Sequence, residues 1–212
     1  SRTFGTYLDE GVRLLTEGVH PIQIDNLGKA IGMPVGPLTV YDEVSLELSR
    51  KAWSTWKDMG VLDNWGDSTI TREVIDTMVG DHGRGGRHHG GGFYEYGEDG
   101  SKAIWPGLQD LYYNPDASVA EDDIKDRLLF RQVIEALKCL ETNVLRTVAD
   151  GNIGSIMGIG APAWTGGLIQ FVNTYGLERF SVRCAELASQ YGDRFDAPAI
   201  VGEKIASGET FA

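Results

Sequence analysis

The chain has 212 residues, of which 42% are hydrophobic, so it can form one large or two small packed domains and is not expected to be disordered. Its formal net charge is −12, from 31 acidic and 19 basic residues. This charge disfavours general binding to nucleic acid or to anionic membranes. Arg84 and Arg87 mark the place where a local basic patch would lie.

The cysteine content and the start of the chain bear on its compartment. Cys139 and Cys184 stand outside any CxxC motif, which suits two reduced thiols; a single disulfide is the less favoured alternative. No basic and apolar signal sequence precedes the first helical pattern, and the chain starts at Ser1 without Met. We therefore expect part of a longer protein without a signal peptide. The most apolar window, 154–172, is broken by glycine and proline, so no membrane insertion is expected.

The hydrophobic periodicity predicts helices. Residues 3–19 place apolar side chains at steps of three and four, and Gly18 closes this helix. Pro21 suits the first position of a second, short helix. Residues 130–144 repeat the first pattern, and only the short run GFYEY, 92–96, resembles a strand. The expected fold class is therefore all-α.

The two halves of the chain resemble each other. The stretch EGVRLLTEGVHPIQID, 10–25, aligns without a gap with EALKCLETNVLRTVAD, 135–150, so that Asp25 lies over Asp150. Further on, GMPVGPL corresponds to GIGAPAWTGGL, and SLE, ending at Glu47, corresponds to GLE, ending at Glu178. Chance similarity between amphipathic helices is the alternative. The matching Glu, Asp and Gly-Pro features favour an internal duplication.

The predicted organisation has three parts. Residues 1–100 form a first helical domain, residues 101–120 a linker, and residues 121–212 a second, degenerate copy of the first domain. The glycine, proline and acidic residues of YGEDGSKAIWPGLQDLYYNPDAS, 96–118, indicate a connection. Asp122 and Asp123 are expected near the start of the next helix, where acidic side chains interact favourably with the helix dipole.

The glycine-rich segment GRGGRHHGGGFYEY, 83–96, suggests several kinds of site. His82, His88 and His89 lack a cysteine or carboxylate at ligand spacing, so a solvated loop is favoured over a metal site. The string GIGAPA, 158–163, matches a dinucleotide fingerprint, but a helical pattern precedes it and Pro162 interrupts it. We therefore expect a turn between helices there and no NAD site.

No other catalytic pattern stands out. The sequence has no GxSxG motif, and neither cysteine lies in a nucleophile motif. Asp42 and Glu43 could cap a helix or line a cleft, but a solvated helix face is the favoured interpretation.

Several segments together resemble one family. The stretch YLDEGVRLLTEGVHPIQIDNLGKAIGMPVGPLTVYDEVSLE, 7–47, looks like the C-terminal domain of 3-hydroxyacyl-CoA dehydrogenases, and GRGGRHHGGGFYEY is similar to that domain's closing element. The second half, with GSIMGIGAPAWTGG, resembles the degenerate tandem copy in multifunctional β-oxidation enzymes of the α-subunit type. The resemblance implies two tandem helical domains of the 6-phosphogluconate dehydrogenase C-terminal-like type.

The resemblance also implies a division of labour. An upstream hydratase region and a Rossmann domain would complete the enzyme, and the Rossmann domain would bind NAD and carry the catalytic His–Glu pair. No catalytic, cofactor-binding or metal-binding residue is then expected in this chain. Ser1 takes the place of the family's substrate-positioning Asn. In the GMPVGP segment, Met33, Pro34, Gly36 and Pro37 would contact the acyl-CoA, while core packing is the alternative role for Met33.

The same resemblance leaves other functions open. A non-catalytic helical module for dimerisation or for docking a thiolase subunit is the alternative to a substrate-covering part of the enzyme. A homodimer and a bacterial-type cytoplasmic location are expected. A sugar-phosphate enzyme of the 6-phosphogluconate dehydrogenase class is disfavoured by the acidic charge and by the scarcity of lysine around residues 32–37. In the glycine-rich segment, we expect Phe93, Tyr94 and Tyr96 to anchor the loop on the helical core, with contact to a CoA phosphate as the alternative.

Overall fold

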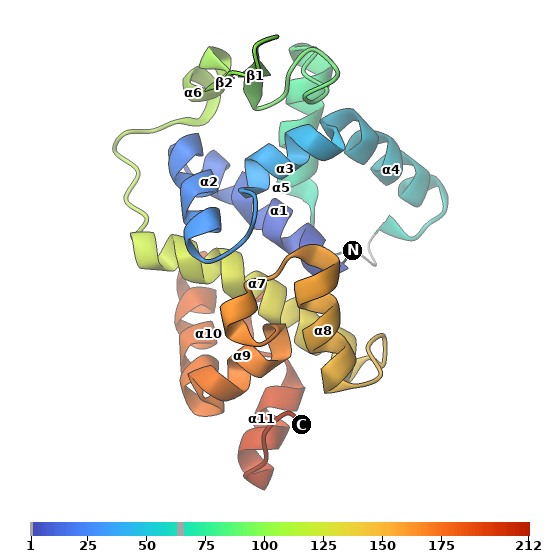
Figure 1. Cartoon of the computed structure of the whole chain (residues 1–212), viewed down its shortest axis with the longest axis vertical. Coiled ribbons are helices and arrows are strands. Elements are labelled where there is room, and N and C mark those ends of the chain that lie inside the picture. The colour runs from blue at the N-terminus through green and yellow to red at the C-terminus, as the bar shows by residue number, and fades with distance from the viewer. Residues whose placement is uncertain (1, 63–65) are drawn as a thin grey trace. The chain divides into compact units, whose positions relative to one another are not determined.

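The computed structural model describes residues 2–62 and 66–212, and these ranges are mostly helical (Figure 1). The expected all-α class is confirmed. The first half of the chain contains α1 (Arg2–Thr16), α2 (Pro21–Ala30), α3 (Pro37–Val44), α4 (Leu46–Asp58), α5 (Thr69–Asp76), the π-helical turn η2 (Thr77–Asp81), β1 (Tyr94–Tyr96), β2 (Lys102–Ile104) and α6 (Pro106–Tyr112). The second half contains α7 (Glu121–Glu141), α8 (Val148–Ile159), η3 (Ala163–Thr165), α9 (Leu168–Tyr175), α10 (Leu177–Tyr191), η4 (Asp193–Phe195) and α11 (Ala199–Ser207).

The chain divides into two compact units. The N-terminal unit comprises Leu8–Gly28 and Val35–Val119, and the C-terminal unit comprises Ser1–Tyr7, Lys29–Pro34 and Ala120–Ala212. The division therefore falls within α1 and again at the end of α2.

The N-terminal unit is built around α1, α3, α4 and α5. Its core is apolar and is formed by Val12, Leu14, Leu15, Ile24, Leu38, Tyr41, Leu46, Val74, Ile75, Met78, Phe93 and Leu108. A buried polar link joins α1 to α5, because Asp9 accepts hydrogen bonds from Thr71 at 2.6 Å and from Arg13 at 2.8 Å. The antiparallel pair β1–β2, with Tyr94 opposite Ile104, is the only sheet in the described ranges.

The C-terminal unit packs around α7, which contacts α8, α9 and α10. Phe130 of α7 lies at the centre of an aromatic cluster. Its ring stacks on Phe180 at a centroid distance of 4.9 Å and meets Phe171 edge-on at 5.8 Å. The fully buried Arg127 places its guanidinium 4.2 Å from the centroid of the Tyr191 ring. Cys139 and Cys184 are both buried and are not bonded to each other.

The helix ends differ from the periodic pattern. The predicted helix 130–144 ends at Glu141, because Asn143 adopts a left-handed φ of 57°, and Val144 lies beyond the helix with its side chain exposed. Similarly, α1 ends at Thr16, although Val19 is buried after the turn at Gly18. The strand prediction at GFYEY is confirmed by β1.

The segment expected to be a connection contains regular structure. Both β2 and α6 lie within 96–118, and Leu108 of α6 is fully buried in the N-terminal unit. Glycine and proline here form tight turns inside a folded unit, which is why their composition resembled that of a linker. None of the described helices is long and apolar enough to cross a membrane.

Candidate functional site

The predicted substrate segment passes from one unit into the other. Met33 and Pro34 belong to the C-terminal unit, whereas Gly36 and Pro37 belong to the N-terminal unit. Ser1, the fifth predicted contact, lies outside the described residues. The four described residues therefore have different surroundings.

Met33 fills the core of the C-terminal unit. Only 3% of its surface is exposed, and its sulfur lies 3.7 Å from Nε2 of Gln132 in α7. Pro34 is exposed and lies against Gly160, where an added Cβ would come within 3.0 Å of the proline ring. Pro34 is thus the more accessible of the two side chains.

Gly36 and Pro37 begin α3 and are tightly packed. A Cβ on Gly36 would lie 2.4 Å from the side chain of Asp25, and Pro37 occupies the first turn of α3, where its missing N–H costs nothing. Pro37 in turn packs on Gly11, where a Cβ would be 2.5 Å from the proline ring. Close packing therefore explains why a glycine and a proline occupy positions 36 and 37.

Asp25 was noted in the sequence only as part of the repeat, but it organises the start of α3. Its carboxylate accepts hydrogen bonds from the backbone N–H groups of Leu38 (2.8 Å) and Thr39 (3.1 Å) and from the Tyr94 hydroxyl (2.7 Å). A carboxylate at a helix N-terminus satisfies otherwise unpaired N–H groups. This role has no local sequence signal, because Asp25 is distant in sequence from its partners.

Asp42 ties the glycine-rich segment to α3. Its two carboxylate oxygens accept the backbone N–H of Phe93 at 2.7 Å and of Tyr94 at 2.9 Å, and Tyr96 donates its hydroxyl at 2.9 Å. Burial raises the pKa of Asp42 to about 6, an effect that these hydrogen bonds partly offset. The solvated helix face predicted for this residue is therefore wrong, whereas Glu43 beside it is exposed.

Arg84 is buried within the glycine-rich segment rather than presented to a phosphate. Its Nε donates to the carbonyl oxygen of Gly92 at 2.6 Å and its Nη2 to that of Tyr94 at 2.9 Å. Its guanidinium carbon lies 4.6 Å from the ring centroid of Trp105. Arg84 and Asp42 thus both hold the glycine-rich segment in place. Phe93 and Tyr94 are buried, so the predicted anchoring by these two residues is confirmed.

The remaining charged groups of this segment are at the surface. Arg87 pairs with Glu43 at 2.7 Å, with both side chains partly exposed. His88 and His89 are exposed, and the described residues contain no group of three His, Cys, Asp or Glu side chains placed to hold a metal ion.

The GIGAPA string lies between helices, as predicted. It follows the end of α8, and Gly160 ends that helix in the left-handed conformation with φ of 68°. The turn η3 and then α9 follow. Because no strand precedes the glycines, the geometry of a dinucleotide-binding turn is missing here.

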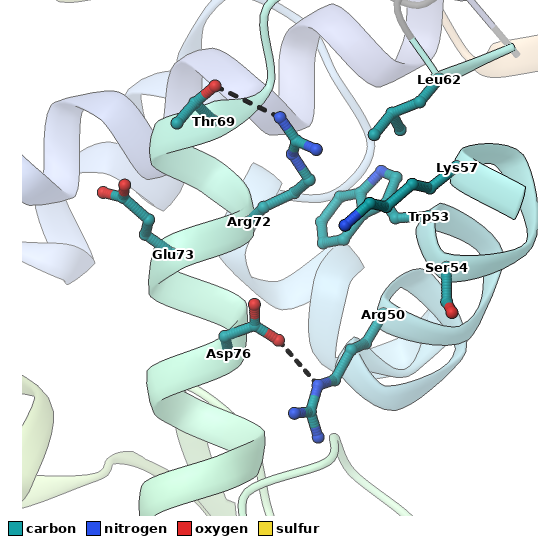
Figure 2. A pocket seen from close by; sticks show the side chains of 9 residues that line it. All are labelled: Arg50, Trp53, Ser54, Lys57, Leu62, Thr69, Arg72, Glu73 and Asp76. Carbon is teal, nitrogen blue, oxygen red and sulfur yellow. Dashed lines mark hydrogen bonds and ion pairs between the residues drawn. The ribbon is translucent and has the colours of Figure 1, made fainter. Parts of the chain in front are cut away.

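An open pocket of about 360 Å³ lies between α4 and α5 (Figure 2). Figure 2 shows Arg50, Trp53 and Lys57 on α4 and Arg72 and Asp76 on α5. Arg50 is paired with Asp76 at 2.7 Å, while Nε of Arg72 is buried and has no hydrogen-bond partner among the described residues. The described residues that line the pocket carry a small excess of positive charge, from Arg50, Lys57 and Arg72 against Glu73 and Asp76.

A second pocket, of about 460 Å³, lies within the C-terminal unit. Its walls are apolar and include Ile31, Leu129, Trp164, Phe171 and Tyr175. Lys125, Asp126 and Arg179 are the charged residues that line it. Ligand sites in proteins typically combine such apolar walls with a few polar groups.

Residues 1–96 match the family model of the 3-hydroxyacyl-CoA dehydrogenase C-terminal domain. The match covers the first 96 of the 212 residues. The resemblance deduced from the sequence motifs is thereby confirmed, and the glycine-rich segment 83–96 lies at the end of the matched domain.

The relationship extends over the whole chain. It is 32% identical over 196 residues to the fatty acid oxidation complex subunit alpha of Vibrio campbellii, and 31% identical over 215 residues to that of Vibrio parahaemolyticus. These matches cover 92% and 100% of the chain but only 27% and 29% of the relatives. The chain therefore spans less than a third of the curated relatives that it matches.

Two solved structures share the fold of this chain. The dehydrogenase part of multifunctional enzyme 1 from C. elegans superposes with a TM-score of 0.65 at 18% identity, over 95% of this chain and 46% of that one. The 3-hydroxybutyryl-CoA dehydrogenase of Escherichia coli superposes with a TM-score of 0.67 at 16% identity, over 98% of this chain and 59% of that one. At these identities the likeness supports the fold alone.

Proposed function

We propose that the chain is the C-terminal, substrate-covering and assembly portion of an NAD-dependent 3-hydroxyacyl-CoA dehydrogenase of fatty-acid β-oxidation. The observation that carries the proposal is the family match over residues 1–96 together with relatedness to fatty acid oxidation subunits along the whole chain. The reaction would oxidise a 3-hydroxyacyl-CoA to the 3-ketoacyl-CoA. NAD would accept the hydride from C3 and would be held by a domain outside this chain.

The role of these residues in the reaction is to bind and cover the substrate. Pro34, which is exposed, is the best placed of the described candidates to meet an acyl group, and Met33, Gly36 and Pro37 would fix the course of the segment around it. We keep Ser1 as a proposed hydrogen-bond donor to the substrate. Covering the acyl group would exclude water while a histidine of the missing domain takes the hydroxyl proton.

The proposal is tested by restoring the missing domains. The chain extended at its N-terminus by a Rossmann domain should oxidise NADH in the presence of acetoacetyl-CoA, whereas the chain alone should be inactive. Pro34→Ser in the extended protein should raise KM with little change in kcat, because it alters binding rather than chemistry. An extended, folded protein without this activity would rule out the dehydrogenase assignment.

We further propose that the chain arose by duplication of one helical domain, with residues 1–100 and 121–212 as the copies and residues 101–120, which contain β2 and α6, as the segment that links them. Two pairs of equivalent positions support this. Asp25 and Asn152 each accept hydrogen bonds from the second and third residues of a following helix. Ser45 and Gly176, which precede α4 and α10, share nearly the same backbone angles.

A docking role is the second candidate function, and one surface favours it. On α8, Ile153 and Met157 are one turn apart and are 65% and 81% exposed. Gly154 and Gly158 beside them have open space around their α-carbons. Homodimerisation or binding of a thiolase subunit at this face would bury it. Size-exclusion chromatography of the chain, alone and with a thiolase, should then respond to Met157→Lys.

The relatives support one further proposal. Because the subunits named above come from Vibrio species, we propose a bacterial-type cytoplasmic location. Localising a tagged full-length protein in cell fractions would test it.

A further inference from the structure

The pocket of about 460 Å³ in the C-terminal unit has a construction that core packing does not explain. It opens between α7, η3 and α9, with Ile31 from the segment Lys29–Pro34 on its wall. Its volume lies in the range of small-molecule sites, which is about 300–1,000 Å³. Leu129, Phe171 and Ile31 form buried apolar wall. A ligand here would bury apolar surface without any rearrangement of the core.

Trp164 is an exposed aromatic side chain held in a fixed position. Its surface is 63% exposed, yet its Nε1 donates a hydrogen bond of 2.7 Å to the carbonyl oxygen of Ile31. Its ring also meets the ring of Phe171 edge-on, at a centroid distance of 5.8 Å. These two contacts hold the exposed indole ring in one position. A ligand that packs on the ring would therefore not have to order it, so the ring is a preorganised binding surface.

Two cations line the same pocket. Arg179 is exposed, stacks over the Tyr175 ring at 5.0 Å, and forms no ion pair with any described residue. Among the residues that the structure describes, Lys125 forms an ion pair only with Asp122, at a long distance of 3.4 Å, and the Asp122 side chain is 92% exposed. Such a pair is weak in water and is readily exchanged for another anion. The chain as a whole has a net charge of −12, so two cations beside an apolar pocket stand out from the acidic surface and favour an anionic ligand there.

The acidic residue in the pocket limits the charge of the ligand. Asp126 is engaged by Arg183 at 2.7 Å, so it does not neutralise Arg179 or Lys125 directly. Its negative charge nevertheless repels a ligand with several negative charges. The pocket therefore suits one anionic group better than the phosphates of a nucleotide.

We propose that this pocket binds a small apolar monocarboxylate. The hydrocarbon part would lie on Trp164, Phe171 and Leu129, and the carboxylate would pair with Arg179 and Lys125. Arg179 can offer two parallel N–H donors to a carboxylate, a geometry that Lys125 lacks. The proposal is independent of the dehydrogenase assignment, because the pocket lies within one unit of this chain.

Isothermal titration calorimetry of the 212-residue chain tests the proposal with two probes, octanoate and 1-naphthoate. We expect at least one of them to bind with one-to-one stoichiometry, and the comparison shows whether the pocket prefers a chain or a ring. Octylammonium, which has the same number of carbon atoms as octanoate and the opposite charge, should not bind. Added salt should weaken the binding, because an exposed ion pair is screened.

Variants assign the binding to this pocket. Arg179→Gln should raise Kd about tenfold, the loss expected for one charge-assisted hydrogen bond. Trp164→Ala should weaken binding similarly, and Trp164→Phe less, because it keeps a ring but loses the hydrogen bond to Ile31. Arg146→Gln, an equal charge change at an exposed residue outside the pocket, should leave Kd unchanged. Circular dichroism checks that each variant is folded.

The proposal is overturned by any of three results. The first is that neither carboxylate binds at millimolar concentration. The second is that octylammonium binds as tightly as octanoate. The third is that Arg179→Gln and Trp164→Ala both keep the Kd of the unmodified chain. None of these results depends on dehydrogenase activity, so they are distinct from a failure of the proposed function.

Discussion

Asp25 and Asn152 make the same two backbone contacts in different units of the chain. Asp25 accepts the N–H groups of Leu38 and Thr39, the second and third residues of α3. Asn152 accepts those of Ile169 and Gln170, the second and third residues of α9, at 3.1 and 2.9 Å. The preceding glycines are equally constrained, since a Cβ on Gly36 or on Gly167 would lie 2.4 Å from the respective side chain.

Under the proposed duplication, this relationship changes the register of the repeat that was read from the sequence. The gapless alignment pairs Asp25 with Asp150. However, Asp150 is exposed and lies in the first turn of α8, where its backbone N–H donates a hydrogen bond to the Thr147 hydroxyl. Asn152 is two residues further along. The alignment could not detect the shift, because an amide and a carboxylate oxygen accept the same hydrogen bonds while their residue letters differ.

Ser45 and Gly176 provide a test of the proposed equivalence. Their backbone angles are φ 78°, ψ 120° and φ 93°, ψ 124°, a region that costs a side chain about 1–2 kcal/mol. Gly176→Ala should therefore lower the free energy of unfolding by about that amount. Ser45→Gly should change it by less than about 1 kcal/mol, because relief of strain offsets the lost hydrogen bond from its Oγ to the carbonyl oxygen of Gly85. Urea denaturation measures both, and equal effects would argue against the shared conformation.

Gly92 is predicted to tolerate no side chain. An added Cβ would lie 1.9 Å from Oδ1 of Asp42, so Gly92→Ala must displace either the loop or the carboxylate. We expect a loss of about 1–3 kcal/mol, as for other overpacked sites. Gly154→Ala is the matched control, since Gly154 lies within α8 with open space around it, and alanine there should stabilise by about 0.5–1 kcal/mol. A Gly92→Ala chain as stable as the parent would mean that the loop is not fixed against Asp42.

The sequence predicted the helices better than it predicted the helix ends and the strand pairing. Periodicity located α1 and α7, because an amphipathic face is encoded locally. It failed at Val144, where a left-handed Asn143 ends the regular structure, and at β2, which is recognisable only from its pairing with β1. These errors have a common cause, since turn conformation and strand pairing depend on residues outside the local window.

The environment of Asp42 was likewise beyond local reasoning. An acidic residue in a short helix with Glu43 beside it has the pattern of a solvated face. It is buried because the N–H groups of Phe93 and Tyr94, about fifty positions away, need an acceptor. The pocket lined by Trp164 and Arg179 was invisible for the same reason, because its walls come from three separate segments.

Arg84 should be far less replaceable than Arg87. Arg84→Lys removes the two donors that satisfy the carbonyl oxygens of Gly92 and Tyr94, and a single ammonium cannot reproduce that geometry. We expect a loss of about 2–4 kcal/mol in the free energy of unfolding. Arg87→Lys, at a partly exposed ion pair, should cost less than about 1 kcal/mol. Thermal and urea unfolding of the two variants make the comparison, and similar losses would contradict the buried role assigned to Arg84.

The buried carboxyl of Asp42 should make stability depend on pH with a definite sign. Its pKa is about 6 in the folded chain, against about 3.9 for an unfolded Asp. Between these values the folded state holds a proton that the unfolded state has released, so the contribution of Asp42 to the free energy of unfolding falls as pH rises from about 4 to 6. The change amounts to at most about 3 kcal/mol and should level off above pH 6 or so.

Asp42→Asn isolates this contribution, because an amide does not titrate. The variant should be less stable at neutral pH, since its NH₂ faces one of the two backbone donors now bound by the carboxylate. The decisive measurement is the slope: urea unfolding at several pH values between about 4 and 7 should show a smaller decline for Asp42→Asn than for the parent chain. Glu43→Gln, at the exposed neighbouring carboxylate, should leave the parent slope in place. Parallel curves for the parent and Asp42→Asn would show that Asp42 keeps one charge state throughout this range.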